Sequence, residues 1–194
     1  MTFDRATTAS LGTAHSPAFG RIFLRDSVED DVAAVQDIYA VHVCHGTGSF
    51  EERAPDCEEM AERRRAILAR GLPYIVAGSG ERILGFAYAA PFRPRPAYRF
   101  TIEDSIYIHP DALGQGLGRL LLGELIVRCE ALGYRQMVAV IGDSRNVRSI
   151  RLHEALGFHR AGTFTSVGFK FGGWLDAVFM PRTLGESHST LPEG

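Results

Sequence analysis

Gly114, Gly116 and Gly118 stand directly before the leucine-rich run LLLGEL, and glycines in this arrangement could bind an anion. Glycine weakens a helix interior by about 0.5–1 kcal/mol relative to alanine, so glycines gathered at a helix start indicate a backbone that a ligand approaches closely. The free N–H groups of a helix N-terminus and the positive end of the helix dipole attract phosphates. A tight strand-to-helix turn without a ligand is the alternative interpretation.

Two common phosphate-binding signatures do not fit these glycines. A P-loop requires lysine and then serine or threonine after its last glycine, whereas Arg119 and Leu120 follow Gly118. The dinucleotide-binding fingerprint requires a glycine where Arg119 stands, and an acidic residue that the apolar run MVAVIG does not contain. The glycines alone therefore do not identify a ligand.

The loop FRPRPAYR, residues 92–99, is a second candidate binding element. Arg93, Arg95 and Arg99 offer fork-shaped guanidinium donors that suit carboxylates and other oxyanions. Two prolines stiffen the loop and limit the entropy lost when it closes over a ligand. Solvated surface charge is the alternative interpretation of the three arginines.

Other chemistry has less support. His42 and His45 with Cys57 lack the second cluster of ligands that a zinc site needs, so no metal is expected. Neither a Ser-His-Asp arrangement nor a G-x-S-x-G motif supports a nucleophilic mechanism. Three aromatic residues could form the wall of an apolar pocket, although aromatics at strand spacing more often belong to a core: Phe50, Tyr98 and Trp174.

Composition narrows the function classes. The 194 residues include 21 basic and 23 acidic side chains, and this near-balance argues against a nucleic-acid partner. No apolar run approaches the ~20 residues that span a bilayer, so no membrane partner is expected. The first 20 residues lack the hydrophobic segment of a secretory signal. The three cysteines cannot all pair, and reduced thiols in a cytoplasmic protein are the simpler interpretation.

The elements that position these groups follow an α/β pattern. Strands are predicted at 21–25, 73–79, 82–90, 99–109 and 137–142, with two more within 158–182. Helices are predicted after residue 27, from Asp56 to Gly71, from the glycines to Gly133, and from Asp143 or Ser144 to Gly157.

The predicted fold is one α/β domain over residues 21–183. Residues 1–20 are expected to form a flexible N-terminal arm and residues 184–194 a C-terminal tail.

The run IYIHPDALGQGLGRLLLGEL resembles the acyl-CoA-binding motif of the GNAT superfamily of N-acetyltransferases. In that family a Gln/Arg-x-x-Gly-x-Gly/Ala loop holds the pyrophosphate of acetyl-CoA, and Gly116 and Gly118 match its last two positions. Leu113 departs from the first position, and Gln115 is a candidate replacement contact. The resemblance implies a central mixed, mostly antiparallel twisted sheet flanked by about four helices. It also implies a set of cofactor-binding residues: Ile106, Tyr107, Ile108, Gly114, Gln115, Gly116, Leu117, Gly118 and Arg119.

The segment NVRSIRLHEALGF resembles the second cofactor motif of the same family. The resemblance implies that Asn146 contacts the pantetheine arm and Ser149 the phosphate end of the cofactor. His153 stands where many members have a tyrosine that protonates the leaving thiolate, and an imidazolium could do the same. Packing against the sheet is the alternative role of His153.

The segment YAAPFRPRPAYRFTIEDSIYIHP is similar to the phosphinothricin or methionine sulfoximine N-acetyltransferase subfamily, and that resemblance spans roughly residues 21–182. It implies that Glu103 is the general base, that Arg93, Arg95 and Arg99 bind the substrate with Phe50 and Tyr98, and that acetyl-CoA is the co-substrate. Strand alternation points the neighbouring Asp104 to the opposite face.

The resulting hypothesis is an N-acetyltransferase that modifies the α-amino group of a small anionic amino acid by direct attack. Acetylation of a polyamine, an aminoglycoside or a protein N-terminus is an alternative, and a non-catalytic acyl-CoA sensor is another. The subfamily tends to form homodimers, and the apolar stretch FKFGGWLDAVF is compatible with that assembly.

Overall fold

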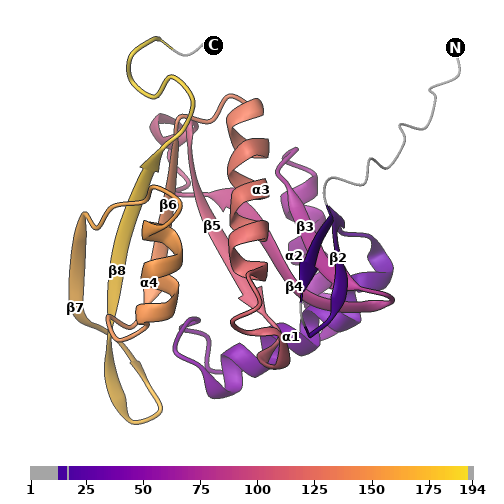
Figure 1. Cartoon of the computed structure of the whole chain (residues 1–194). Coiled ribbons are helices and arrows are strands. Elements are labelled where there is room, and N and C mark those ends of the chain that lie inside the picture. Colours follow the sequence, from indigo (N-terminus) through magenta and orange to yellow (C-terminus); the bar gives the residue numbers. More distant parts are fainter. Residues whose placement is uncertain (1–12, 17, 192–194) are drawn as a thin grey trace, which may run out of the picture.

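A computed structural model describes residues 13–16 and 18–191. One sheet runs through these residues in the order β1-β2-β3-β4-β5-β6-β8-β7, and only the β5–β6 pair is parallel (Figure 1). The strands are β1 Thr13–Ser16, β2 Gly20–Asp26, β3 Tyr74–Ser79, β4 Arg82–Pro91, β5 Thr101–Ile108, β6 Gln136–Gly142, β7 Gly162–Lys170 and β8 Gly173–Thr183. The helices are α1 Val32–His45, α2 Cys57–Leu68, α3 Leu117–Ala131 and α4 Val147–Glu154.

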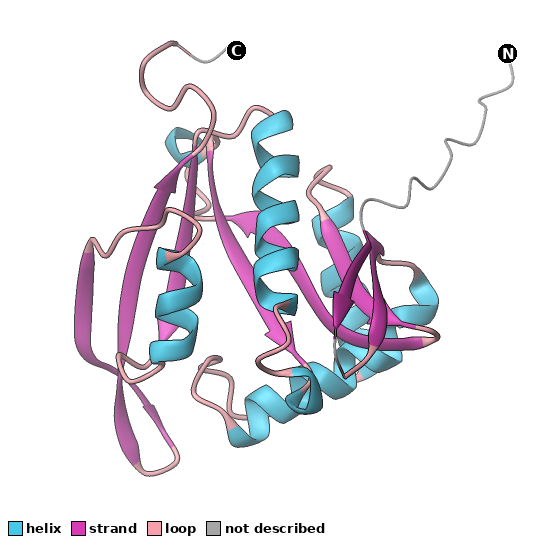
Figure 2. Cartoon of the chain, viewed as in Figure 1, coloured by secondary structure: helices cyan, strands magenta, loops and turns pink. Residues whose placement is uncertain are grey.

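The helices cover both faces of the sheet (Figure 2). One core lies under α3 and α4, where Leu117, Leu121 and Ile150 pack against residues of β5, β6 and β8. The second core lies under α1 and α2, where Ile38 and Met60 pack against aromatic residues of β3 and β4. The predicted single α/β domain with a mixed, mostly antiparallel sheet and four flanking helices is confirmed.

The N-terminal region differs from its prediction. An arm over residues 1–20 is wrong for residues 13–16, because these form β1 and pair antiparallel with β2. The run Thr-Ala-His-Ser has no apolar alternation, so only the pairing with β2 makes it a strand. Residues 1–12 lie outside the described residues. In the predicted C-terminal tail, Leu184 is buried and its N–H donates to the carbonyl of Arg135 at 3.0 Å.

Local signals explain where most helices begin and end. The helix predicted to begin at Asp56 does so, because the Asp56 carboxylate accepts from the N–H of Glu59 at 2.9 Å and caps α2. The predicted start of α4 at Asp143 or Ser144 is wrong, because the cap is Asn146, whose side chain accepts from the N–H of Ser149. The Asp143 carboxylate instead accepts from the backbone N–H and the guanidinium of Arg145.

The feature that shapes the site is the separation of β5 from β6. The two strands pair from Thr101 opposite Gln136 to Asp104 opposite Ala139, and then diverge. On their outer sides β5 stays paired with β4 to Ile108, and β6 with β8 to Gly142. A gap therefore opens in the middle of the sheet.

Candidate active site

A cavity of about 690 Å³ occupies this gap and reaches both faces of the sheet. Its wall brings together eight of the residues singled out in the sequence: Phe50, Glu103, Ile106, Tyr107, Ile108, Asn146, Ser149 and His153. These residues come from the loop after α1, from β5 and from α4, which are far apart in the chain. The gap thus gathers the predicted carboxylate and the second predicted cofactor motif around one space.

Glu103 is a carboxylate of β5 in the cavity wall, on the α1 side of the sheet. Burial, together with the negative charge of Asp104, raises the pKa of Glu103 to about 7, and the charge of Arg93 opposes the rise. A group that gains and loses a proton near neutral pH suits general acid–base chemistry. The geometry and the raised pKa therefore mark Glu103 as the candidate base.

Asp104 and His153 form a buried ion pair on the α4 side. His153 Nε2 lies 3.0 Å from Asp104 Oδ2, and Nδ1 lies 2.8 Å from the carbonyl of Ser149. Both ring nitrogens face acceptors, so the ring is satisfied when it carries both protons. Burial lowers the pKa of His153, but the hydrogen bond and charge of Asp104 outweigh it and raise the pKa overall. The two acceptors and the raised pKa therefore favour the imidazolium form at the cavity wall.

A hydroxyl and carboxylate network closes the α1 side of the cavity. Tyr39 donates to Glu51 at 2.9 Å and lies 3.1 Å from the hydroxyl of Ser49. Its ring packs edge-on against Tyr107, with centroids 4.8 Å apart. Burial raises the pKa of Tyr107 well above its ordinary value, so this phenol stays protonated. Arg63 pairs with Glu51 at 2.7 Å and fixes the network to α2.

The predicted anion-binding loop lies at the start of α3. Gly114 and Gly116 have φ angles of +77° and +81°, a left-handed conformation that glycine adopts without strain. Gly118 lies close to α4, because a Cβ there would come within 3.0 Å of Leu152. The side chain of Leu117 is buried in the core, so only its backbone can face a ligand.

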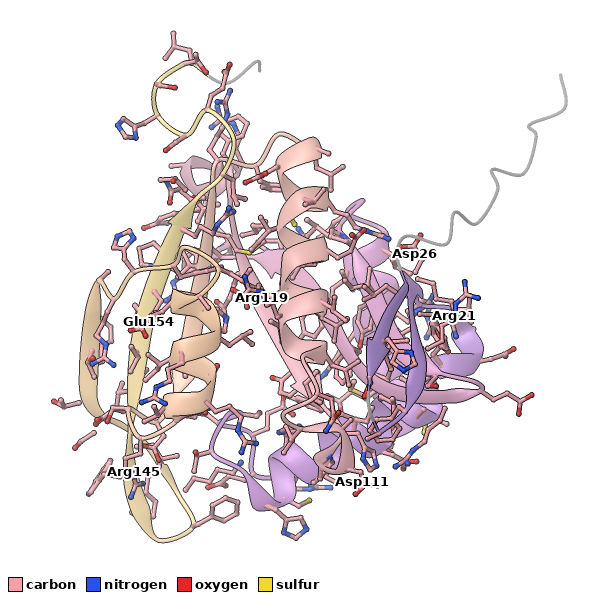
Figure 3. The ribbon with its side chains drawn as sticks, viewed as in Figure 1. Arg21, Asp26, Asp111, Arg119, Arg145 and Glu154 are labelled. Carbon is pink, nitrogen blue, oxygen red and sulfur yellow. The ribbon has the colours of Figure 1, made fainter. Side chains whose placement is uncertain are left out.

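Two polar side chains of this loop have different surroundings. The Gln115 amide oxygen accepts from the Ser16 hydroxyl at 3.0 Å and is held by β1. Arg119 is exposed on the first turn of α3 and lies between α3 and α4 (Figure 3). Leu113 connects the loop to the cavity, whose wall it joins.

The gap also exposes backbone groups of β5. The N–H of His109 donates to the carbonyl of Leu84 in β4 at 2.8 Å, so alternation directs the N–H groups of Ile106 and Ile108 away from β4, toward the gap. The carbonyl of Ile108 accepts from His42 Nε2 at 2.9 Å. Burial lowers the pKa of His42, which fits a neutral ring that donates from Nε2. Two N–H donors of β5 are thus available to a ligand that lies along the strand.

The arginine-rich loop lies outside the residues that line the cavity. Arg93, Arg95, Tyr98 and Arg99 are all exposed, and Pro96–Tyr98 form one 3₁₀ turn. The guanidinium of Arg93 stacks on Phe92 with 4.5 Å to the ring centroid. Its charge nevertheless acts on Glu103, which places it within electrostatic range of the cavity.

Sequence reasoning missed several residues of the wall. Asp104 was recognised as facing away from Glu103, but its pairing with His153 was not, because the partners lie 49 positions apart. Glu51 stands in the motif GSFEE, which carried the subfamily resemblance without a role for the carboxylate. His42, considered above only as a metal ligand, also lines the cavity. The remaining missed residues give no signal in one sequence: Gly48, Ser49, Tyr88, Ser105, Ala139, Val140, Ile141, Gly142, Arg148, Leu152 and Ala177.

Metal binding and membrane insertion have no support among the described residues. No group of three or more histidine, cysteine, aspartate or glutamate side chains is arranged to hold a metal ion in this part of the chain. No helix in the same residues has the length and apolar character needed to cross a membrane.

Comparison with known proteins agrees with this geometry. The Acetyltransferase (GNAT) family model matches residues 35–158. The chain is 55% identical over 165 residues to a phosphinothricin N-acetyltransferase from Alcaligenes faecalis, covering 85% of this chain and 84% of that protein. It is 37% identical over 163 residues to an L-methionine sulfoximine/L-methionine sulfone acetyltransferase from Salmonella typhimurium, covering 84% and 95%.

A solved structure extends the likeness to three dimensions. The crystal structure of a GNAT superfamily phosphinothricin acetyltransferase from Sinorhizobium meliloti, in complex with acetyl-CoA, superposes with a TM-score of 0.86 at 47% identity. The match covers 89% of this chain and 93% of that one. The chain therefore belongs to the GNAT family of N-acetyltransferases, with acetyl-CoA as its co-substrate.

Proposed function

We propose that this enzyme acetylates the α-amino group of a small anionic amino acid or analogue, with phosphinothricin and methionine sulfoximine as the first candidates. The observation that carries the proposal is Glu103, a carboxyl group of pKa about 7 in the wall of the cavity that the divided sheet creates. The choice of substrates is supported by similarity to a phosphinothricin N-acetyltransferase and to an L-methionine sulfoximine/L-methionine sulfone acetyltransferase.

The proposed role of Glu103 is to prepare the amine. A free amino acid amine is mostly ammonium at neutral pH, and only its neutral form has a lone pair for attack. The Glu103 carboxylate accepts that proton, directly or through a water molecule. The N–H groups of Ile106 and Ile108, which face the gap, are the proposed donors to the developing oxyanion.

The residues at the other side of the gap fit acetyl-CoA, which supplies an acetyl group activated as a thioester. The backbone N–H groups from Gly114 to Gly118 are the proposed partners of its pyrophosphate, helped by the absence of side chains at the glycines. Asn146 and Ser149 are the proposed contacts to the pantetheine arm and the phosphate end. His153 is the proposed acid for the leaving thiolate, a role that requires one ring N–H to leave Asp104 or the carbonyl of Ser149.

The proposed substrate contacts come from the cavity wall and from the arginine-rich loop. Phe50 stands in the cavity wall, and Arg93, Arg95, Tyr98 and Arg99 lie on the exposed loop beside it. Closure of this loop over an anionic substrate would bring guanidinium groups to its carboxylate.

We also propose a homodimer. Four large aromatic side chains of the β7–β8 hairpin are more than half exposed, and such a patch commonly marks an interface. They are Phe164, Phe169, Phe171 and Trp174. The cytoplasm is the proposed location, since Cys44, Cys57 and Cys129 are all free thiols.

An acetylation assay tests the function. The wild type and Glu103→Gln are assayed with acetyl-CoA and phosphinothricin, methionine sulfoximine or ordinary amino acids. We expect turnover of at least one anionic analogue and a loss of about 10²–10⁴-fold in kcat for the variant. Binding of coenzyme A without turnover of any of these amines would overturn the proposed function. Full activity of Glu103→Gln would overturn the general base.

A further inference from the structure

Lys170 has an unusual place in this chain. It is the only lysine among the 21 lysine and arginine residues. It is the last residue of β7 and is only 4% exposed. Its ammonium donates to the carbonyl of Gly46 at 3.0 Å and to the carbonyl of Ser49 at 2.8 Å. It also lies 4.8 Å from the centroid of the Phe171 ring.

The chemistry of this contact explains the residue type. An ammonium is a compact charge with three donors, whereas a guanidinium is a planar fork that suits two parallel acceptors. Among the described residues no carboxylate pairs directly with Lys170. Its direct partners are two carbonyls and an aromatic face, while the charges of Glu51 and Glu52 act from farther away. A buried cation is costly unless its donors are satisfied, so this arrangement requires the loop to hold one conformation.

The loop that Lys170 holds is residues 46–51, between α1 and α2. A second contact from β7 acts on the same loop, because a Cβ at Gly168 would lie 2.5 Å from the ring of Phe50. A Cβ at Gly142 in β6 would lie 2.2 Å from the carbonyl oxygen of Thr47. The loop therefore packs directly against the backbone of Gly142 and Gly168, where there is no room for a side chain. It contributes four residues to the cavity wall: Gly48, Ser49, Phe50 and Glu51.

We propose that Lys170 is a positioning residue for the acceptor side of the active site. By binding two carbonyls of the 46–51 loop, it fixes the wall that faces the amine across from Glu103. This inference rests on the proposed function, in which the amine binds between that wall and Glu103. Lys170 is not itself among the residues that line the cavity, so it acts through the loop.

Loss of Lys170 is expected to affect the two substrates differently. The proposed acetyl-CoA contacts lie on α3, α4 and β5, whereas Lys170 holds only the loop after α1. Loss of its ammonium leaves two carbonyls unpaired and frees the loop. The KM for the amine is therefore expected to rise, while the KM for acetyl-CoA stays unchanged.

Steady-state kinetics of Lys170→Met test this separation, with the amine that the wild type acetylates best. We expect the KM for the amine to rise about tenfold, as for the loss of a charge-assisted hydrogen bond. Arg160→Met is the matched control, because it removes a positive charge at an exposed position. An unchanged KM for the amine in the folded variant, or an equal rise in both KM values, would overturn the proposal.

A spectroscopic measurement on the wild type covers the case in which Lys170→Met does not fold. Because the chain has one lysine, ¹⁵Nζ labelling gives a single side-chain ammonium signal. We expect this signal to be visible at neutral pH with slowed hydrogen exchange. Exchange as fast as that of free lysine would overturn the proposal. Failure of the proposed function is a distinct result, since it is seen as absent turnover in the wild type.

Discussion

Replacing Glu103 by glutamine is expected to stabilise the fold at neutral and alkaline pH. The folded protein holds the Glu103 proton up to a pKa of about 7, while the unfolded chain releases it near the ordinary value of 4.5. Between these values the folded state binds more protons, so the free energy of unfolding of the wild type falls as the pH rises. Glutamine does not titrate, so the free energy of unfolding of the variant does not fall for this reason.

The size of the effect follows from the pKa values. At about 1.4 kcal/mol for each tenfold change in the dissociation constant, the rise from 4.5 to about 7 amounts to at most about 3.5 kcal/mol. Glu103 retains some contact with solvent, which reduces the expected effect to about 1–2 kcal/mol. The gain of the variant over the wild type should grow from about pH 5 to about pH 7 and then stay constant.

Urea unfolding of both proteins at several pH values measures this difference, and comparison at each pH cancels the titration of all other groups. The exposed Glu52→Gln is the matched control. A difference that does not change with pH for Glu103→Gln, or that shrinks as the pH rises, would refute the assignment of a raised pKa to Glu103.

Three further predictions concern the same site. Arg93→Met removes a charge that lowers the pKa of Glu103, so the acidic limb of the kcat/KM profile should move to higher pH; an unmoved limb would separate this loop from the base. His153→Gln leaves Asp104 buried without its cation and should destabilise the fold by about 3–5 kcal/mol in urea unfolding; a near-neutral result would contradict the ion pair. Gly116→Ala forces a side chain into a left-handed conformation, with a cost of about 1–2 kcal/mol, and should weaken coenzyme A binding in calorimetry; unchanged affinity would argue against this loop as the anion site.

Local sequence signals predicted the elements and much of the cavity. The cap at Asp56 depends on a contact with a residue three positions away. Strand alternation places the neighbours Glu103 and Asp104 on opposite faces of the sheet. Such signals depend only on residues that lie a few positions apart in the sequence. They were therefore sufficient to predict that Glu103 lies on a strand, as it does in β5.

The contacts that complete the site could not be predicted in this way. The pairing of Asp104 with His153 and the binding of Lys170 to the loop at Gly46 join residues that lie 49 and 124 positions apart. Each depends on the register of whole strands and on the packing of helices over them. The strand at 13–16 was missed for the same reason, because its residues carry no pattern without the partner strand.

The division of the sheet after Asp104 has a consequence for the order of events in catalysis. A solid sheet would force both reactants to approach from one side, and the first to arrive would obstruct the second. Here the acyl donor and the amine are expected to reach the centre from opposite layers. Neither has to wait for the other, so we expect both to be held together before acyl transfer, with initial-rate plots that intersect rather than run parallel.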